Sequence, residues 1–202
     1  MSYKTIIVDI GAVGFPIGSF LPAVIRPPYE LHLFEPSFKK DTSKVEHQLK
    51  KLGFNNNVYL HDIALSDKQD IVDFYVTQKS NCSSLRKPNN EVLYDRKDIT
   101  TYEKIQIQTD TLDNVLGHLS HIDYLKLDTQ GSEYEILLGA SKTLSKVLYI
   151  KCEVEYIELY EGQKTKEDVI NLLSQHNFEA VGIANPHKHH CDIFFRNKKL
   201  IF

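Results

Sequence analysis

Short runs of apolar and β-branched residues recur along the chain, and they are typical of the buried strands of a parallel sheet. The runs are Thr5–Ile10, Leu31–Phe34, Val58–Leu60, Tyr124–Leu127 and Val147–Val154. Between them lie segments with apolar positions three and four residues apart, the spacing of a helix packed on a sheet. The helices predicted from that spacing and from capping residues are Phe15–Val24, Phe38–Leu52, Thr109–Leu116, Glu133–Ala140 and Thr165–His176.

The C-terminal part of the chain departs from this alternation of strand and helix. Phe178–Ile183 and Cys191–Arg196 are two consecutive strand-like runs, which predict an antiparallel hairpin. The fold class is therefore α/β, a doubly wound, mostly parallel Rossmann-like sheet with a C-terminal antiparallel hairpin. That arrangement is typical of methyltransferases that use S-adenosylmethionine (SAM), rather than of dinucleotide dehydrogenases.

The middle of the chain is harder to place. Ile71–Val76 and Lys104–Gln108 alternate apolar and polar residues and predict two more strands. Thr77–Arg96, between them, is polar and without periodicity. A connection of this length usually forms either a functional lid or a mobile loop.

The composition excludes several classes of protein. A length of 202 residues predicts one domain, residues 1–202, and a net charge of −3 argues against a general nucleic-acid binder. No apolar run is long enough to span a membrane, and the N-terminus lacks the regions of a signal peptide. The cysteines are odd in number and widely spaced, which argues against a disulfide framework and predicts the cytoplasm; they are Cys82, Cys152 and Cys191.

Acidic residues close several of the predicted strands. Asp9, Glu35 and Asp128 stand at strand ends, and Asp62 is a fourth candidate. The carboxyl ends of parallel strands share one edge of the sheet, where ligands bind in open α/β folds. Several acids there would repel a pyrophosphate but suit SAM, which carries positive charges, ribose hydroxyls and an amine. Taken alone, Asp128 is also explained as a cap or turn residue of a plain β–α connection.

The first turn adds a glycine pattern to these acids. Asp9-Ile10-Gly11-Ala12-Val13-Gly14 follows the first strand directly, and its glycines allow close approach of the backbone to a ligand. The full GxGxxG pattern of a nicotinamide oxidoreductase is absent, as is a GxxxxGK[ST] phosphate loop.

Six segments in order resemble the FkbM family of SAM-dependent methyltransferases over nearly the whole chain. They are Asp9–Ala12, Phe34-Glu35-Pro36, Ala64–Asp67 with Phe74–Val76, Ser83-Ser84-Leu85, Lys126–Glu133, and Glu153-Val154-Glu155 with Leu159–Gly162. The resemblance implies a cofactor role for the first turn, ribose binding by Glu35 and an adenine site near residues 62–67. The residues expected to bind SAM are Asp9, Gly11, Ala12, Gly14, Glu35, Pro36, Asp62, Ile63, Ala64 and Asp128.

The chain departs from the family pattern in the first turn and at one later position. Val13 replaces an Asn, Phe15 replaces a Gly, and Gln130 stands where the family usually has Glu. The alternative hypothesis is accordingly a degenerate, non-catalytic module of the same fold that binds ligands or partners.

The resemblance implies O-methylation of a hydroxyl group on a glycan or small metabolite. An alcohol loses its proton near the transition state, so a carboxylate or His within reach assists the transfer. Asp128 is the first candidate catalytic residue, and Glu133 and Glu153 are the other two; each of these also has a structural explanation. A homo-oligomer is compatible with the sequence.

His187, His189, His190 and Cys191 form an H-x-H-H-C pattern, which raises the question of a metal. Neighbouring residues of an extended chain point to opposite faces, so few of them could share one ion. We therefore predict a solvated loop and no metal.

Overall fold

The computed structural model describes residues 3–12, 28–37, 42–51, 54 and 57–200. The predicted helix Phe15–Val24 lies outside this part of the chain, as do Val13, Gly14 and Phe15. The predicted helix Phe38–Leu52 is described from residue 42 onward, where it forms α2 (Thr42–Lys51).

The largest element is a seven-stranded sheet with the order β3-β2-β1-β7-β8-β10-β9. The first five strands in that order are parallel, and β10 is antiparallel to both of its neighbours. This confirms the predicted mixed sheet, with the C-terminal hairpin completing it. The strands are β1 (Thr5–Ile10), β2 (Tyr29–Phe34), β3 (Val58–His61), β7 (Ile122–Leu127), β8 (Val147–Glu155), β9 (Phe178–Ala184) and β10 (His190–Asn197).

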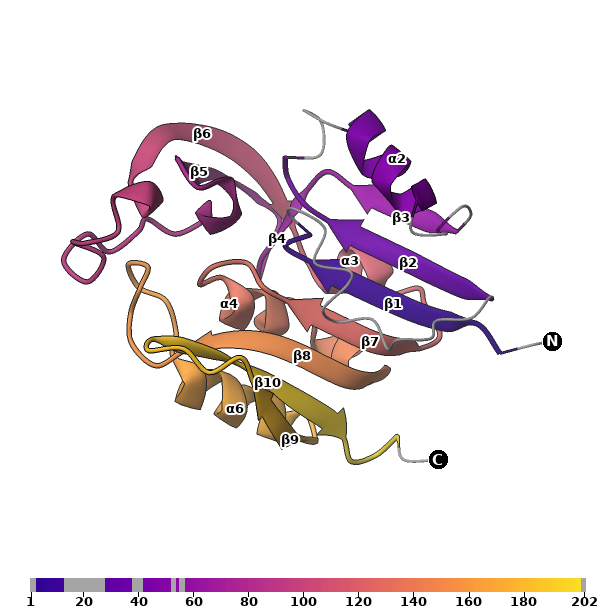
Figure 1. Ribbon diagram of the computed structural model, residues 1–202. Coiled ribbons are helices and arrows are strands. Elements are labelled where there is room, and N and C mark those ends of the chain that lie inside the picture. The colour runs from indigo at the N-terminus through magenta and orange to yellow at the C-terminus, as the bar shows by residue number, and fades with distance from the viewer. Residues whose placement is uncertain (1–2, 13–27, 38–41, 52–53, 55–56, 201–202) are drawn as a thin grey trace.

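Helices cover both faces of this sheet (Figure 1). Alternate residues of β1 point to opposite faces, so Ile7 packs with Leu49 of α2, while Val8 belongs to the larger core on the other face. Helices on both faces confirm the doubly wound architecture. The helices of the larger core are α3 (Leu112–Leu116), α4 (Glu133–Leu138), α5 (Ser141–Leu144) and α6 (Lys166–Gln175).

A separate three-stranded sheet, in the order β4-β6-β5, stands beyond the carboxyl ends of the parallel strands (Figure 1). Two of its strands, at Ile71–Val76 and Lys104–Gln108, were predicted, but the short strand at Ala64–Leu65 and the pairing into a second sheet were not. β5 and β6 are antiparallel to each other, so they make an arm rather than a β–α–β unit. The elements are β4 (Ala64–Leu65), β5 (Asp70–Thr77) and β6 (Thr101–Asp110), with the 3-10 turns η2 (Ser80–Cys82) and η3 (Lys97–Ile99) in the connection between β5 and β6.

The start of α3 differs from the prediction, which had Thr109 or Asp110 as its cap. β6 continues to Asp110, and the Thr111 hydroxyl accepts a hydrogen bond from the Asn114 backbone N–H at 3.1 Å. The prediction was two residues early because the pairing of β6 with β5 extends the strand into the helix signal.

Two histidines on neighbouring strands make stability sensitive to acid. His61 stacks on Phe34, and its Nε2 lies 2.9 Å from Nδ1 of His32. Burial, reinforced by His32, lowers the pKa of His61 to about 4. In the unfolded chain a histidine takes up a proton near pH 6.5. Between about pH 6.5 and about pH 4, His61 is therefore protonated in the unfolded chain but not in the folded one. Stability is therefore expected to fall as the pH drops from about 6.5 to about 4.

The corresponding test is urea unfolding of the wild type, His61→Gln and His47→Gln at pH 5 and pH 7.5. His61→Gln should lose less stability than the wild type between the two pH values, whereas His47→Gln, an exposed change on α2, should behave as the wild type does. Equal pH dependence in all three proteins would contradict this explanation.

Candidate functional site

A cavity of about 240 Å³ opens at the carboxyl ends of the parallel strands. It brings together residues at or just beyond the carboxyl ends of β1, β2, β7 and β8, with residues around β4, in β5 and in the β5–β6 connection. Of the residues predicted as candidates, this cavity is lined by Gly11, Glu35, Pro36, Ile63, Ala64, Asp128 and Glu153.

Gly11 allows the turns after β1 and β7 to pack closely. Its φ of +80° lies in the left-handed region, and a Cβ at this position would stand 1.8 Å from the backbone oxygen of Asp128. The N–H groups of Gly11 and Ala12 donate to the Phe34 carbonyl at 3.0 and 3.1 Å. This position therefore requires glycine for both reasons, and the turn is fixed against β2 and β7.

Glu35 presents a buried carboxylate to the same cavity. The residue is 5% exposed, and its Oε1 accepts a hydrogen bond from the Ser37 backbone N–H at 2.9 Å. Burial raises the pKa of Glu35, while the bond from Ser37 opposes that shift. The remaining oxygen lone pairs make Glu35 suited to accept hydrogen bonds from ligand hydroxyls.

The Gln130 side chain bridges two acids of the cavity lining, Asp128 and Glu153. Its Nε2 donates to Asp128 Oδ1 at 3.0 Å and to Glu153 Oε2 at 2.8 Å. Burial, followed by the charges of Asp128 and Glu155, raises the pKa of Glu153 to about 10. Glu153 consequently carries a proton at neutral pH.

Gln130 itself has a left-handed backbone, with φ at +61°. Such a conformation is uncommon outside glycine and persists where neighbours hold it. Here the Ser84 hydroxyl donates to the Gln130 carbonyl at 2.7 Å, and the Tyr160 hydroxyl lies 3.1 Å from Gln130 Oε1. The amide is thus positioned by two segments distant in sequence.

Glu133 lies behind the cavity rather than in it. It is 3% exposed, and its carboxylate accepts hydrogen bonds from Thr129 N at 2.5 Å, Thr129 Oγ1 at 3.0 Å and Gly131 N at 2.9 Å. Ser132, the N-cap residue of α4, makes no side-chain capping bond. This geometry assigns Glu133 to the shape of the turn that carries Asp128, instead of to contact with an acceptor.

Asp9 is also placed away from the cavity lining. It is 2% exposed, and its Oδ1 accepts a hydrogen bond from Lys126 Nζ at 2.9 Å. The same ammonium lies 3.5 Å from Asp128 Oδ2. Burial disfavours the charged Lys126, but the two aspartates outweigh burial and raise its pKa. Lys126 thus connects the buried Asp9 to an acid of the cavity.

Two other predicted residues do not line the cavity, and a third lies outside the described part of the chain. Ala12 packs in the smaller core, Asp62 precedes the lining residue Ile63, and Gly14 lies outside the described residues. The structure adds lining residues that the sequence analysis did not single out as candidates. These are Ile10, Phe34, Leu65, Phe74, Asn81, Ser83, Leu85, Thr129, Gln130 and Ser132.

The chemistry of this cavity favours a cationic ligand with an apolar ring. Among the described residues, its acidic lining groups are Glu35, Asp128 and Glu153, and neither Lys nor Arg lines it. Phe34, Leu65, Phe74 and Leu85 add apolar surface. An acidic wall can compensate positive charge and accept hydrogen bonds, whereas it would repel a phosphate.

The described residues contain no group of three or more His, Cys, Asp or Glu side chains arranged to hold a metal ion. His187 and His190 have ring centroids 4.7 Å apart, and Cys191 is fully buried. All three cysteines are free, as their spacing predicted. No helix in this described portion is long and apolar enough to cross a membrane.

One family model matches most of the chain. Residues 13–180 match the methyltransferase FkbM domain. The 2-O-methyltransferase NoeI of Sinorhizobium fredii (strain NBRC 101917 / NGR234) is 29% identical over 205 residues, covering 96% of this chain and 80% of that protein.

Two solved structures show a similar fold. Methyltransferase FkbM from Methylobacillus flagellatus KT has a TM-score of 0.59 at 15% identity; the match covers 96% of this chain but only 44% of that longer one. Magnesium protoporphyrin IX methyltransferase from Synechocystis PCC 6803, with bound SAM, has a TM-score of 0.50 at 10% identity, covering 96% of this chain and 71% of the other.

Proposed function

Because the chain belongs to the FkbM family of methyltransferases, we propose that it transfers the methyl group of SAM to a hydroxyl group on a glycan or small metabolite. The observation that carries this proposal is the acidic cavity at the carboxyl ends of β1, β2, β7 and β8. Its charge and its apolar patch both match the chemistry of SAM.

Different residues of the cavity would contact different parts of SAM. Glu35, buried at the end of β2, would accept hydrogen bonds from the ribose hydroxyls. Phe34, Leu65 and Phe74 would contact the adenine ring. Asp128 would face the positively charged part of the cofactor, which supplies an electrophilic methyl group when bound.

The contribution of the protein to the reaction is mainly orientation. Holding donor and acceptor in line converts a bimolecular step into an effectively unimolecular one. Lys126 and Gln130 both hold the Asp128 carboxylate, so this acid is fixed before any ligand arrives. A fixed carboxylate loses little entropy on binding a ligand, which supports Asp128 as the positioning acid.

The similarity to a 2-O-methyltransferase supports a hydroxyl acceptor. The competing hypothesis, a non-catalytic module of the same fold, rests on Val13 and Phe15, which lie outside the described residues. The acidic lining of the cavity favours the enzyme, because a passive module has no need of so many buried acids.

Incubation with methyl-¹³C-labelled SAM and a panel of methyl glycosides and polyols tests the proposal. We expect a ¹³C methoxy product with the wild-type chain and at least a tenfold lower rate with Asp128→Asn, which keeps the shape but loses the charge. Binding of S-adenosylhomocysteine (SAH) without any labelled product from the panel would instead favour the non-catalytic module.

A further inference from the structure

A second cavity, of about 470 Å³, adjoins the first. Asn81, Gln130 and Glu153 line both cavities, so these three side chains form the boundary between them. A methyl transferase needs such an arrangement, since donor and acceptor must meet at one point while binding in separate places. The volume lies in the range of small-molecule sites.

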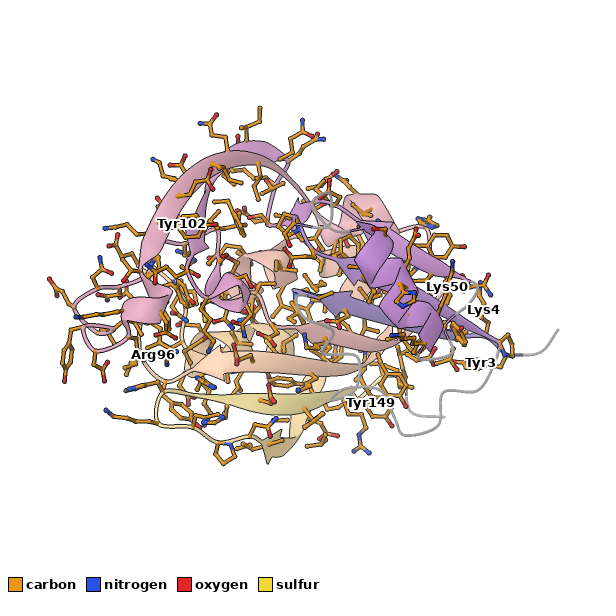
Figure 2. All side chains as sticks on the ribbon, turned by 45° about the horizontal axis from the view of Figure 1, so that its top comes forward. Tyr3, Lys4, Lys50, Arg96, Tyr102 and Tyr149 are labelled. Carbon is orange, nitrogen blue, oxygen red and sulfur yellow. The ribbon has the colours of Figure 1, made fainter. Side chains whose placement is uncertain are left out.

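The lining of the second cavity is mixed in character. Val92, Leu93, Ile99 and Leu159 supply apolar surface, and the loop His187–His190 supplies imidazoles. Arg96, on the β5–β6 connection, also lines this cavity and is seen in Figure 2 at the opposite side of the molecule from Tyr3 and Lys4. A lining that combines apolar surface with polar groups suits a compact ring with hydroxyl groups, such as a pyranoside.

His190 lies beside Glu153, one of the residues at the boundary. It begins β10, its Nε2 lies 3.8 Å from Glu153 Oε1, and its side chain is 34% exposed. Burial, followed by the nearby His187, lowers the pKa of His190. A neutral imidazole at pH 7 has one nitrogen free to accept a proton.

Charged and titratable groups surround His190 on several elements. On its own loop and strand lie His187, Lys188, His189 and Asp192; β8 contributes Glu153, and the end of β7 contributes Asp128. Asp95 and Arg96 line the cavity from the β5–β6 connection. His187 and His189 lower the pKa of His190, whereas Asp192 and Asp128 raise it.

We propose that the second cavity binds the hydroxyl acceptor, a pyranoside or similar polyol ring, and that His190 receives the proton of the hydroxyl group that is methylated. This inference rests on the proposed function. The acceptor oxygen forms a bond to the methyl carbon, the carbon–sulfur bond breaks with its electron pair kept by sulfur, and the hydroxyl proton goes to His190 Nε2. The partly exposed imidazolium then returns the proton to water.

Glu153 is the less suitable proton acceptor, although it was the sequence-based candidate. It already holds a proton at neutral pH, so it can donate a hydrogen bond but cannot take up the proton. In this arrangement Glu153 positions the acceptor and His190, while His190 is the catalytic base.

The first test needs no knowledge of the true acceptor. The full chain, labelled with ¹⁵N in its histidines, is titrated by NMR with bound SAH and with bound sinefungin, a SAM analogue that carries an ammonium in place of the sulfonium. If His190 faces the methyl group, the added cation should lower its pKa by at least about 0.5 unit relative to the SAH complex. His121, which directly precedes β7 and lies 3.0 Å from the Lys4 carbonyl, should not change.

Identical titration of His190 in both complexes would overturn the inference. Failure of both ligands to bind would count against the proposed function instead, so the two failures are distinguishable.

The second test compares His190→Gln and His121→Gln with methyl glycosides as acceptors. We expect His190→Gln to lower kcat about 100-fold and to remove the acidic limb of the pH profile, with SAH affinity unchanged. A wild-type rate in His190→Gln would contradict the assignment.

Discussion

Gly11→Ala is expected to destabilise the fold by more than about 3 kcal/mol and to abolish SAH binding. The added Cβ would stand 1.8 Å from the Asp128 backbone oxygen, and alanine is strained at a φ of +80°. The two turns that carry Gly11 and Asp128 would have to separate, and both line the cavity. The fold and the site therefore depend on the same contact.

Urea unfolding and calorimetric titration with SAH measure the two effects of Gly11→Ala. Gly182→Ala is the matched control, because an added Cβ there meets its nearest atom, Cδ2 of Phe194, at an ordinary 3.9 Å. We expect Gly182→Ala to bind SAH as the wild type does. A Gly11→Ala protein with wild-type stability and affinity would show that the turns are not packed as described.

Lys126→Met is expected to cost about 3–5 kcal/mol of stability, the usual penalty for leaving one charge of a buried pair without its partner. Lys126 and Asp9 have side chains 2% exposed, and Asp9 Oδ2 already lacks a hydrogen-bond partner among the described residues. Removal of the ammonium leaves the Asp9 carboxylate without compensation. It also releases Asp128, so SAH affinity should fall as well.

The double variant Asp9→Asn/Lys126→Met separates charge from packing. Asparagine removes the uncompensated charge, so chemical denaturation should show the double variant to be more stable than Lys126→Met alone. If the double variant is as unstable as the sum of the two single changes, the pair does not interact as the distance of 2.9 Å indicates.

The parallel core could be predicted because its strands are buried on both faces. Thr5–Ile10 and Val147–Val154 are mainly apolar or β-branched runs, and such runs predict strands irrespective of their partners. Glu35 and Asp128 were placed correctly at the cavity for a related reason. Both follow directly after a buried strand, so their position at the carboxyl edge follows from the sheet itself.

Contacts between distant residues could not be predicted. Asp9 appeared to be a ligand-facing acid, but its partner Lys126 lies 117 positions away. The role of Gln130 depends on Ser84 and Tyr160, which periodicity does not connect to it. The second cavity likewise forms where the β5–β6 connection meets the loop before β10.

The second sheet was not predicted, because it too depends on contacts between residues distant in the sequence. β5 and β6 each alternate as an ordinary strand does, and alternation does not reveal which strand a neighbour pairs with. The structural role of Glu133 was not predicted either, although its hydrogen-bond partners are close to it in the sequence. An acid in the first turn of a helix usually faces solvent, whereas here it folds back onto Thr129 and Gly131.

Calorimetric titration of the chain with SAH tests the central claim, that the acidic cavity is a SAM site. We predict micromolar binding, about −8 kcal/mol, that is lost or at least tenfold weaker in Glu35→Ala and in Asp128→Ala. Glu161→Ala, a change at a half-exposed acid, serves as the control and should bind as the wild type does. Absence of binding by the wild type, or equal affinity in all four proteins, would contradict the account.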